Sequence, residues 1–118
     1  MTTAAKKLAT TYFRAWREKD FPTLRSVLAD DVTFVGSMGT ANGVDECVQG
    51  LQGMAKQLDD IVVHAMVADE SDVITWYDLK MQGVDPLPTA NWSHVEKGKI
   101  TAIRATFDPR KLLEASPS

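Results

Sequence analysis

The sequence is poor in the residues that would tie it to a metal, a disulfide framework or a nucleic acid. It contains one cysteine and two histidines, all far apart, so it offers neither an internal disulfide nor a metal-ligand spacing. The net charge is -3 and no basic run is present, which argues against a nucleic-acid partner. No apolar stretch approaches the roughly 20 residues that span a bilayer, and residues 1–7 lack the apolar core of a secretory signal. We therefore expect a cytoplasmic protein with no metal, no cofactor and no membrane partner.

The composition that is present is typical of a packed globular domain. Apolar residues make up 44% of the chain and charged residues 25%, both ordinary fractions for such a domain. A length of 118 residues provides for one hydrophobic core. We therefore predict a single domain over residues 1–118, ordered from about residue 3 to about residue 115, with a disordered tail at Ser116-Pro117-Ser118.

Helical spacing of apolar residues predicts two helices near the start of the chain. Residues 5–16 place alanine, leucine and aromatic side chains on one stripe, with most charged residues elsewhere. Asp20 has the side chain of a helix cap, and Phe21-Pro22 after it opens a short second helix whose buried face ends near Leu28. The first helix therefore brings Tyr12 and Trp16 to the core.

A third helix is predicted over residues 44–58, after a glycine-rich loop at 36–43. Asn42 is its expected cap, because an asparagine side chain can accept hydrogen bonds from the first free amides of a helix. Gly50 and Gly53 lie inside this helix, and each costs about 1 kcal/mol relative to alanine.

The remaining segments alternate in the manner of strands. They cover residues 31–35, 61–68, 73–81, 89–96 and 99–107. The last two are joined by a tight turn, so they form a hairpin. Helices followed by such a meander predict an α+β fold, with the helices packed on one face of a mainly antiparallel sheet.

The end of the chain has the most characteristic sequence. The segment Gly98–Pro109 reads as a strand that Asp108 ends, with Asp108 able to cap a short helix and Pro109 at its favoured first position. Together with the Leu28–Phe34 segment and the aromatic first helix, it resembles the SnoaL-like branch of the nuclear transport factor 2-like superfamily. The resemblance covers roughly residues 8–113. It implies a cone-shaped fold whose strongly curved sheet encloses an apolar pocket, and it implies dimers through the outer face of the sheet.

The resemblance also implies sets of catalytic residues, and this sequence lacks most of the acidic residues in those sets. Ketosteroid isomerases in the superfamily use a tyrosine on the first helix, and Tyr12 occupies that place. Their base and their protonated aspartate would fall at Gly36 and Ser93, so the proton-moving groups are missing.

Most of the catalytic residues of the epoxide hydrolases and polyketide cyclases of the superfamily are also absent from this sequence. The first aspartate of the hydrolase pattern could match Asp78, but its arginine becomes Trp76 and its second aspartate becomes Ala105. The cyclases place their usual acid/base aspartate near Ala105 as well. The resemblance therefore implies the family's pocket without most of its known acid/base equipment.

Strand alternation divides the sheet into two faces. Within residues 73–81 the apolar set that includes Tyr77 should face the helices, which turns Trp76 and Asp78 outward; comparison with the epoxide hydrolases would instead turn Asp78 inward. The first register buries less charge. It predicts the inward sets Thr101, Ile103, Ala105, Phe107 and Asn91, Ser93, Val95.

From these faces we predict a pocket and an interface. The predicted ligand-binding residues are Tyr12, Trp16, Phe34, Met38, Met54, Leu58, His64, Met66, Tyr77, Asn91, Ser93, Ala105 and Phe107. The predicted homodimer interface on the outer face comprises Trp76, Trp92, His94 and Arg104.

Three residues are catalytic candidates, and each has a plainer structural interpretation. Tyr12 is either a core aromatic or a hydrogen-bond donor in the pocket. His64 is either a satisfied strand histidine or a general base, since its unperturbed pKa of about 6.5 suits neutral pH. Asp78 is either an ion-pair partner of Lys80 or Arg104 at the interface or a proton carrier.

Three functions follow as alternatives. The first is an isomerase, cyclase or lyase acting on a small apolar substrate, with Tyr12 polarising an oxygen and His64 or Asp78 moving a proton. The second is a non-catalytic domain that binds a small apolar or polycyclic molecule. The third is a dimerisation module. The missing carboxylates favour the second over the known chemistries of the first.

Overall fold

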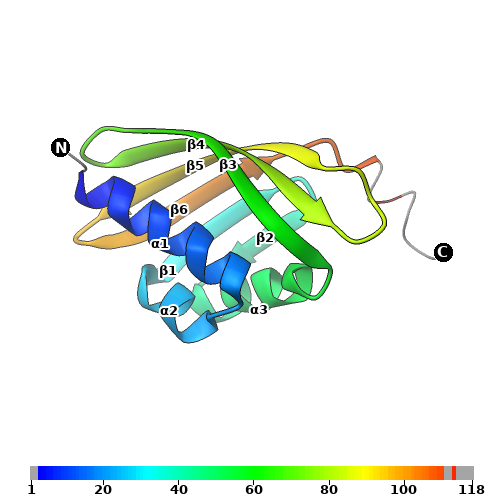
Figure 1. Ribbon diagram of the computed structural model, residues 1–118. Helices are drawn as coiled ribbons and strands as arrows, with labels where there is room; N and C mark the ends of the chain where they lie inside the picture. The colour runs from blue at the N-terminus through cyan, green and yellow to red at the C-terminus, as the bar shows by residue number, and fades with distance from the viewer. Residues whose placement is uncertain (1–2, 111–112, 114–118) are drawn as a thin grey trace.

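The computed structural model describes residues 3–110 and 113 (Figure 1). The tail at Ser116-Pro117-Ser118, expected to be disordered, lies outside these residues. The helices are α1 (Ala4–Glu18), α2 (Phe21–Ser26) and α3 (Val44–Ala55). The strands are β1 (Leu28–Gly36), β2 (Gly39–Asn42), β3 (Leu58–Ala68), β4 (Asp72–Met81), β5 (Leu87–Glu96) and β6 (Lys99–Thr106).

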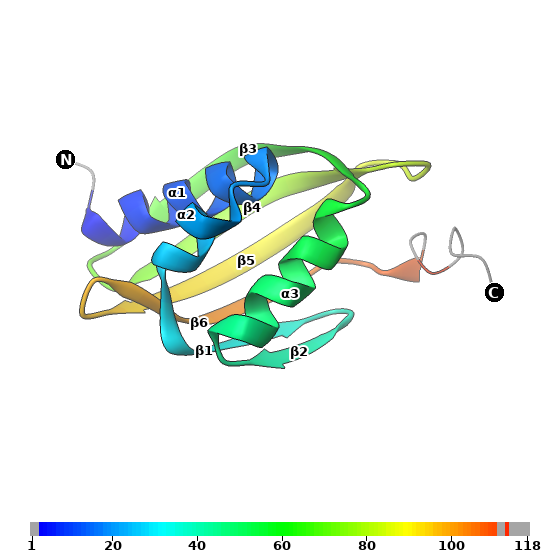
Figure 2. The same cartoon turned by 90° about the horizontal axis from the view of Figure 1, so that it is seen from below.

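The strands form one curved sheet in the order β2-β1-β6-β5-β4-β3. Neighbours run antiparallel except β1 and β6, which are parallel. All three helices lie on one face, with α1 mainly against β3 and α3 against β1 and β2 (Figure 2). We call this covered face the inner face and the opposite one the outer face. The predicted α+β architecture is confirmed.

The loop expected at residues 36–43 contains a strand. β2 pairs with β1 in a tight hairpin, with Phe34 opposite Ala41 and Gly36 opposite Gly39. The Ser37 hydroxyl fixes the turn to the end of β6, because its oxygen accepts from the Phe107 amide and donates to the Phe107 carbonyl, both at 2.9 Å. Clustered glycines concealed the strand in the sequence.

The helix caps are partly as expected. Asp20 accepts a hydrogen bond from the Thr23 amide at 3.3 Å, which confirms its capping role. Asn42 does not cap α3; Gly43 occupies that position without a side-chain cap, and the Glu46 carboxylate instead accepts from the Asn42 amide at 3.0 Å. At the other end of the chain, Asp108 accepts from the Arg110 amide at 3.0 Å, as a cap would.

The strand pairing shifts register at four places, and two of these β-bulges affect residues whose face was predicted. In β3, His64 is the extra residue between pairs Val63–Tyr77 and Ala65–Trp76. In β6, Thr101 is the extra residue where the pairing with β5 shifts, so the expectation that Thr101 points inward is wrong. Ile100 is fully buried in its place, and the Thr101 hydroxyl donates to the His94 carbonyl at 3.3 Å.

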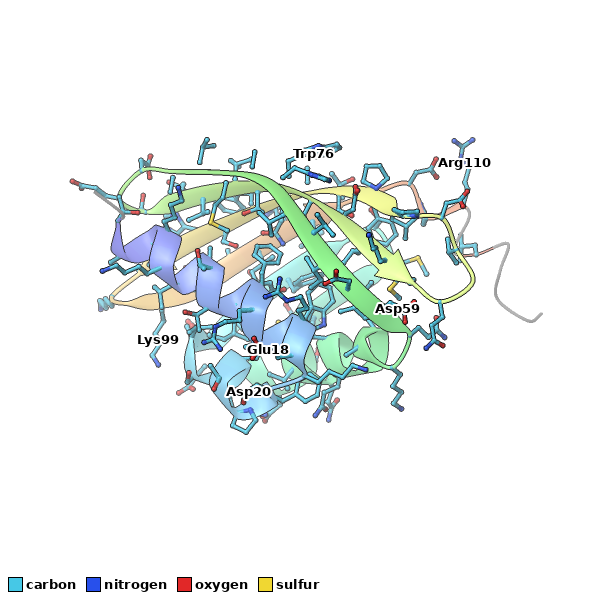
Figure 3. All side chains as sticks on the ribbon, in the orientation of Figure 1. Glu18, Asp20, Asp59, Trp76, Lys99 and Arg110 are labelled. Carbon is cyan, nitrogen blue, oxygen red and sulfur yellow. The ribbon has the colours of Figure 1, made fainter. Side chains whose placement is uncertain are left out.

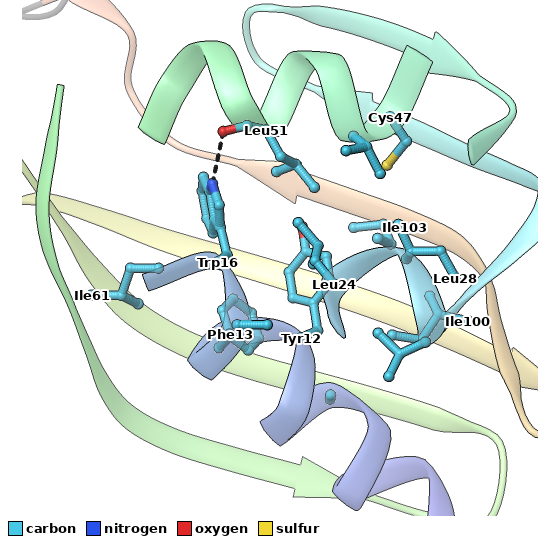
Figure 4. Packing of buried hydrophobic residues seen from close by; sticks show 14 of the residues in the cluster. Tyr12, Phe13, Trp16, Leu24, Leu28, Cys47, Leu51, Ile61, Ile100 and Ile103 are labelled. Atoms are coloured by element: carbon cyan, nitrogen blue, oxygen red, sulfur yellow. Dashed lines mark hydrogen bonds between the residues drawn. The ribbon is translucent and has the colours of Figure 1, made fainter. Parts of the chain in front are cut away.

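The core lies between the helices and the inner face (Figure 4). Aromatic rings of α1 make its centre: Tyr12 meets Phe13 edge-on at 5.0 Å between ring centroids, and Phe13 lies 4.8 Å from Tyr77 of β4. Thr75, Tyr77 and Asn91 are buried while Ile74 and Trp76 are exposed, which confirms the first of the two registers considered for β4. Among the described residues, no helix is long and apolar enough to cross a membrane.

Candidate functional site

A small cavity of about 50 Å³ lies between α1, α3 and the inner face of the sheet. Most of the predicted ligand-binding residues line it: Tyr12, Trp16, Phe34, Met38, Met54, Tyr77, Asn91, Ala105 and Phe107. Gly36, Ser37, Gly39, Leu79 and Thr89 also line it and were not predicted. Leu79 and Thr89 could have been found, because each lies two residues from a predicted inward residue on its own strand. Ser37 and Gly39 depend on the hairpin.

Tyr12 is the polar group that defines this cavity. The residue is only 1% exposed, yet among the described residues its hydroxyl has no hydrogen-bond partner. No fully enclosed side-chain nitrogen or oxygen of the described residues lacks a partner, so the Tyr12 oxygen must border open space. Burial raises the pKa of Tyr12 well above its usual value, and the nearby Cys47 and Tyr77 add to the effect. Tyr12 is therefore a neutral hydrogen-bond donor at physiological pH.

The second polar group is a pair from two neighbouring strands. The Tyr77 hydroxyl lies beside Asn91, which partly offsets the effect of burial on the pKa of Tyr77, and the Asn91 oxygen accepts from the Ser93 hydroxyl at 3.1 Å. Burial raises the pKa of Tyr77 as well. Tyr77, Asn91 and Ser93 thus form one buried polar group on β4 and β5, and Tyr12 brings a second hydroxyl to the cavity from α1.

Two of the three catalytic candidates lie outside the cavity. The bulge in β3 turns His64 to the outer face, where its Nε2 lies 3.0 Å from the Asp78 carboxylate. The prediction that His64 lines the pocket is therefore wrong, and the partner of Asp78 is His64 rather than the expected Lys80 or Arg104. Tyr12 and the His64–Asp78 pair lie on opposite faces of the sheet, so they cannot act on one molecule together.

Three other predicted ligand-binding residues do not line the cavity. Leu58 is a buried core residue at the start of β3. Met66 packs against the core from β3 and receives a hydrogen bond from the Thr10 hydroxyl at its sulfur. Ser93 is buried behind Asn91 and supports it.

The outer face carries a cluster of exposed apolar and aromatic residues. Trp76 is 47% exposed and projects from the side of the sheet away from the helices (Figure 3). Ile74 is 46% exposed and lies opposite both Val67 of β3 and Trp92 of β5. Arg104 of β6 is the next residue along this row.

A hydrogen-bond network borders this cluster. One oxygen of Asp72 accepts from the Trp92 indole nitrogen at 2.9 Å and lies 2.8 Å from Nδ1 of His94. The Trp92 and His94 rings stack with centroids 5.9 Å apart. Each histidine of the outer face is thus paired with an aspartate of β4. Over residues 3–110 and 113, no three histidine, cysteine, aspartate or glutamate side chains converge as a metal site would require.

This arrangement of helices on a curved sheet is the NTF2-like fold, and known structures share it closely. An NTF2-like protein of unknown function from Cytophaga hutchinsonii is 29% identical, with a TM-score of 0.85 over 96% of this chain and 97% of that one. A protein from Kribbella flavida is 27% identical, with a TM-score of 0.91 over 97% of this chain and 94% of that one. An LEH-like epoxide hydrolase of M. tuberculosis is 21% identical, with a TM-score of 0.78 over 94% of this chain and 87% of that one, and shows the fold alone.

The sequence itself places the chain within one family of this fold. The profile of the SnoaL-like domain matches residues 9–103, and the chain belongs to that family. No curated protein matches the sequence.

Proposed function

We propose that this protein binds a small, mostly apolar molecule whose oxygen enters the inner cavity, where the Tyr12 hydroxyl donates a hydrogen bond to that oxygen. The observation that carries the proposal is the unpartnered hydroxyl of a residue that is otherwise buried. A hydroxyl that borders a cavity and has no protein partner is available to a ligand or to a water molecule. The rest of the lining is largely apolar and aromatic, as small-molecule sites usually are.

Binding is better supported than an acid/base reaction. No aspartate, glutamate, histidine, lysine or arginine is among the described residues that line the cavity. An isomerisation, cyclisation or epoxide opening of the family's type needs a group that gains or loses a proton near neutral pH. Tyr12 and Tyr77 do not meet this need, because their pKa values are raised by burial. They suit recognition of an oxygen rather than proton transfer.

A comparison of matched ligands and matched variants tests this function. The probes are cyclohexanone, which carries an acceptor oxygen, and methylcyclohexane, which has a similar shape without one. Trp16 lines the cavity, so binding should change its fluorescence. We expect cyclohexanone to bind the wild type and to lose about three- to tenfold in affinity in Tyr12→Phe, the effect of one hydrogen bond. Binding of methylcyclohexane should be insensitive to the substitution.

Tyr77→Phe is the matched control, because it removes the other tyrosine hydroxyl that lines the cavity, the one beside Asn91. Its effect on cyclohexanone should be smaller than that of Tyr12→Phe. The proposal is wrong if cyclohexanone does not bind the wild type, or if both tyrosine variants bind it as the wild type does.

A second function, self-association through the outer face, is supported by a separate observation. Val67, Ile74 and Trp76 are 65%, 46% and 47% exposed and lie together on neighbouring strands of the outer face. Exposed apolar residues that are contiguous in this way are typical of protein interfaces. We propose that two copies of the chain pack through this face, with Trp76, Trp92, His94 and Arg104 in the contact.

Sedimentation equilibrium tests the dimer. Trp76→Glu would place a charge within the apolar cluster and should convert a wild-type dimer to a monomer. Val63→Glu is the control. Val63 is 41% exposed, as the cluster residues are, but it pairs with Tyr77, which faces inward. It also precedes the β3 bulge, whereas Val67 of the apolar cluster follows it. A wild type that sediments as a monomer at micromolar concentration contradicts this second function and leaves the first untouched.

A further inference from the structure

A second and larger apolar pocket adjoins the inner cavity. It has a volume of about 260 Å³ and lies between α3 and the β1–β2 hairpin. Its own walls are Ala41 of β2 and Cys47, Gly50 and Leu51 of α3. It shares Phe34, Met38, Gly39 and Met54 with the inner cavity. We call it the hairpin compartment. None of its residues beyond the shared wall was expected to contact a ligand, since the hairpin was not anticipated.

The sizes of the two spaces suggest different tasks. A water molecule occupies about 30 Å³ in the liquid, so the inner cavity of about 50 Å³ has room for one polar group and little more. The hairpin compartment is about five times larger and no charged residue is among its described lining. The compartment therefore offers adjoining space for the carbon body of a molecule whose oxygen reaches Tyr12.

The shared wall is built from side chains that can move. Met38 is 51% exposed and Met54 is half-buried, and unbranched thioether side chains change rotamer easily. The ring of Phe34 folds over Gly36: its Cε1 atom lies 2.7 Å from where a Cβ of residue 36 would be. The lack of a side chain at Gly36 therefore allows the Phe34 ring to border both spaces.

The wall of the compartment that Leu51 forms, unlike the shared wall, is held in place by a hydrogen bond. The Trp16 indole nitrogen donates to the Leu51 carbonyl at 3.0 Å, which holds α3 against α1. Trp16 lines the inner cavity and Leu51 lines the compartment, so this bond sets the distance between the two spaces.

We infer that the hairpin compartment receives the apolar body of the ligand whose oxygen meets Tyr12. The inference rests on the function proposed above and narrows it to a class: an elongated, uncharged molecule with one carbonyl or hydroxyl oxygen near one end. Gly50 is the position chosen to test the available length, because it borders the compartment and a Cβ placed on it meets no atom within 4 Å, so a larger side chain fits there.

A homologous series of linear methyl ketones tests the inference. Each added methylene that enters the compartment should raise affinity about fourfold, the equivalent of about 0.8 kcal/mol per buried methylene. The gain should stop once the compartment is full. In Gly50→Leu the side chain occupies the compartment, so long ketones should lose about tenfold or more in affinity while the shortest ones bind as they do to the wild type.

Gly53→Leu is the matched control on the same helix. A Cβ at Gly53 also meets no atom within 4 Å, but Gly53 does not border the compartment. Both substitutions replace a helical glycine, so both should fold, which a thermal melt verifies. We expect Gly53→Leu to bind the whole series as the wild type does.

The outcomes separate this inference from the function on which it rests. If ketones bind but chain length has no effect, or if Gly50→Leu binds long ketones as tightly as the wild type, the compartment is not used and the Tyr12 site stands alone. If no ketone of any length binds the wild type, both the proposed function and this inference fail.

Discussion

The indole nitrogen of Trp16 donates a hydrogen bond to the main-chain carbonyl of Leu51 at a distance of 3.0 Å (Figure 4). The two residues are 35 positions apart in the sequence, and the bond is buried. It joins the middle of α3 to the end of α1, two helices that pack on opposite parts of the sheet. Because each residue also borders one of the two adjoining spaces, a single contact supports both the fold and the proposed ligand site.

Trp16→Phe should destabilise the protein by about 2–3 kcal/mol. The change removes a buried hydrogen bond, worth about 1 kcal/mol, and leaves a void where the second indole ring packed. Urea unfolding followed by circular dichroism measures the loss. Trp76→Phe is the control, because Trp76 is 47% exposed and its replacement should change stability by less than about 0.5 kcal/mol. Equal effects of the two substitutions would show that the Trp16–Leu51 bond does not stabilise the fold.

The sequence predicted the elements whose side chains repeat regularly, and it did less well where the repeat breaks. Alternation along β4 placed Tyr77 on the inner face, which the structure confirms. Pairing across β5 likewise placed Asn91 inward. His64 and Thr101 were misplaced because each is the extra residue of a bulge, and a bulge reverses the face of the residues beyond it. Nothing in the local residue pattern marks either position.

The alkaline behaviour of the two tyrosines is a direct consequence of their burial. Burial raises the pKa of both Tyr12 and Tyr77 above the value of about 10 that they have in the unfolded chain. A raised folded-state pKa means that the stabilising contribution is complete below pH 10 and is lost as pH rises beyond it. We expect phenolate absorbance to appear only as the protein unfolds, not as a separate titration of the folded state.

This is measured by following absorbance near 295 nm and circular dichroism in one alkaline titration, and the two curves should coincide. The chain has only these two tyrosines, so no exposed tyrosine obscures the result. Phenolate formation at about pH 10 with the fold intact would mean that at least one of the hydroxyls is open to water.

His94 gives the protein a pH dependence in the mildly acidic range. Its hydrogen bond to Asp72 raises the pKa of His94, and the same bond is the main reason that the pKa of Asp72 is lowered. Glu96, whose carboxylate lies 3.8 Å from Nε2 of His94, acts in the same direction on the histidine. The histidine contribution is complete below about pH 6.5 and lost as pH rises through the raised pKa; the aspartate contribution is present above about pH 4 and lost as pH falls.

We therefore expect the pair to stabilise the fold most between about pH 4 and pH 6.5. His94→Gln should remove the part of the stability decline that occurs between about pH 6 and pH 8, measured as the difference in melting temperature between the two conditions. Both groups are partly exposed, so added salt should weaken the effect in the wild type. An unchanged pH profile in His94→Gln would show that the pair does not contribute to stability.

The residues of the candidate site, like the elements of the fold, were predicted where the sequence pattern is regular and missed where it is not. Tyr12, Tyr77 and Asn91 followed from one helical stripe and two alternating strands. The hairpin compartment did not, because it needs β2, and the short segment from Gly39 to Asn42 has too few apolar residues to indicate a strand. The unpartnered state of the Tyr12 hydroxyl could not be predicted from the sequence, since it depends on the distances between three separate elements.

Ala105 offers a final test of how dry the inner cavity is. It lies opposite Asn91 in the β5–β6 pair and lines the cavity. Ala105→Asp should destabilise the protein by about 2 kcal/mol at pH 7, because an ionised carboxylate would replace a half-buried methyl group at a cavity wall that has no cation among its described lining. Burial would raise the pKa of the new aspartate, so its cost should shrink as pH falls towards 4 and the group becomes neutral. Thr106→Asp, at the next and exposed position of β6, should have little effect at either pH. A melting temperature for Ala105→Asp equal to that of the wild type at pH 7 would show that water reaches this wall of the cavity, and that a carboxylate could be placed there without loss of the fold.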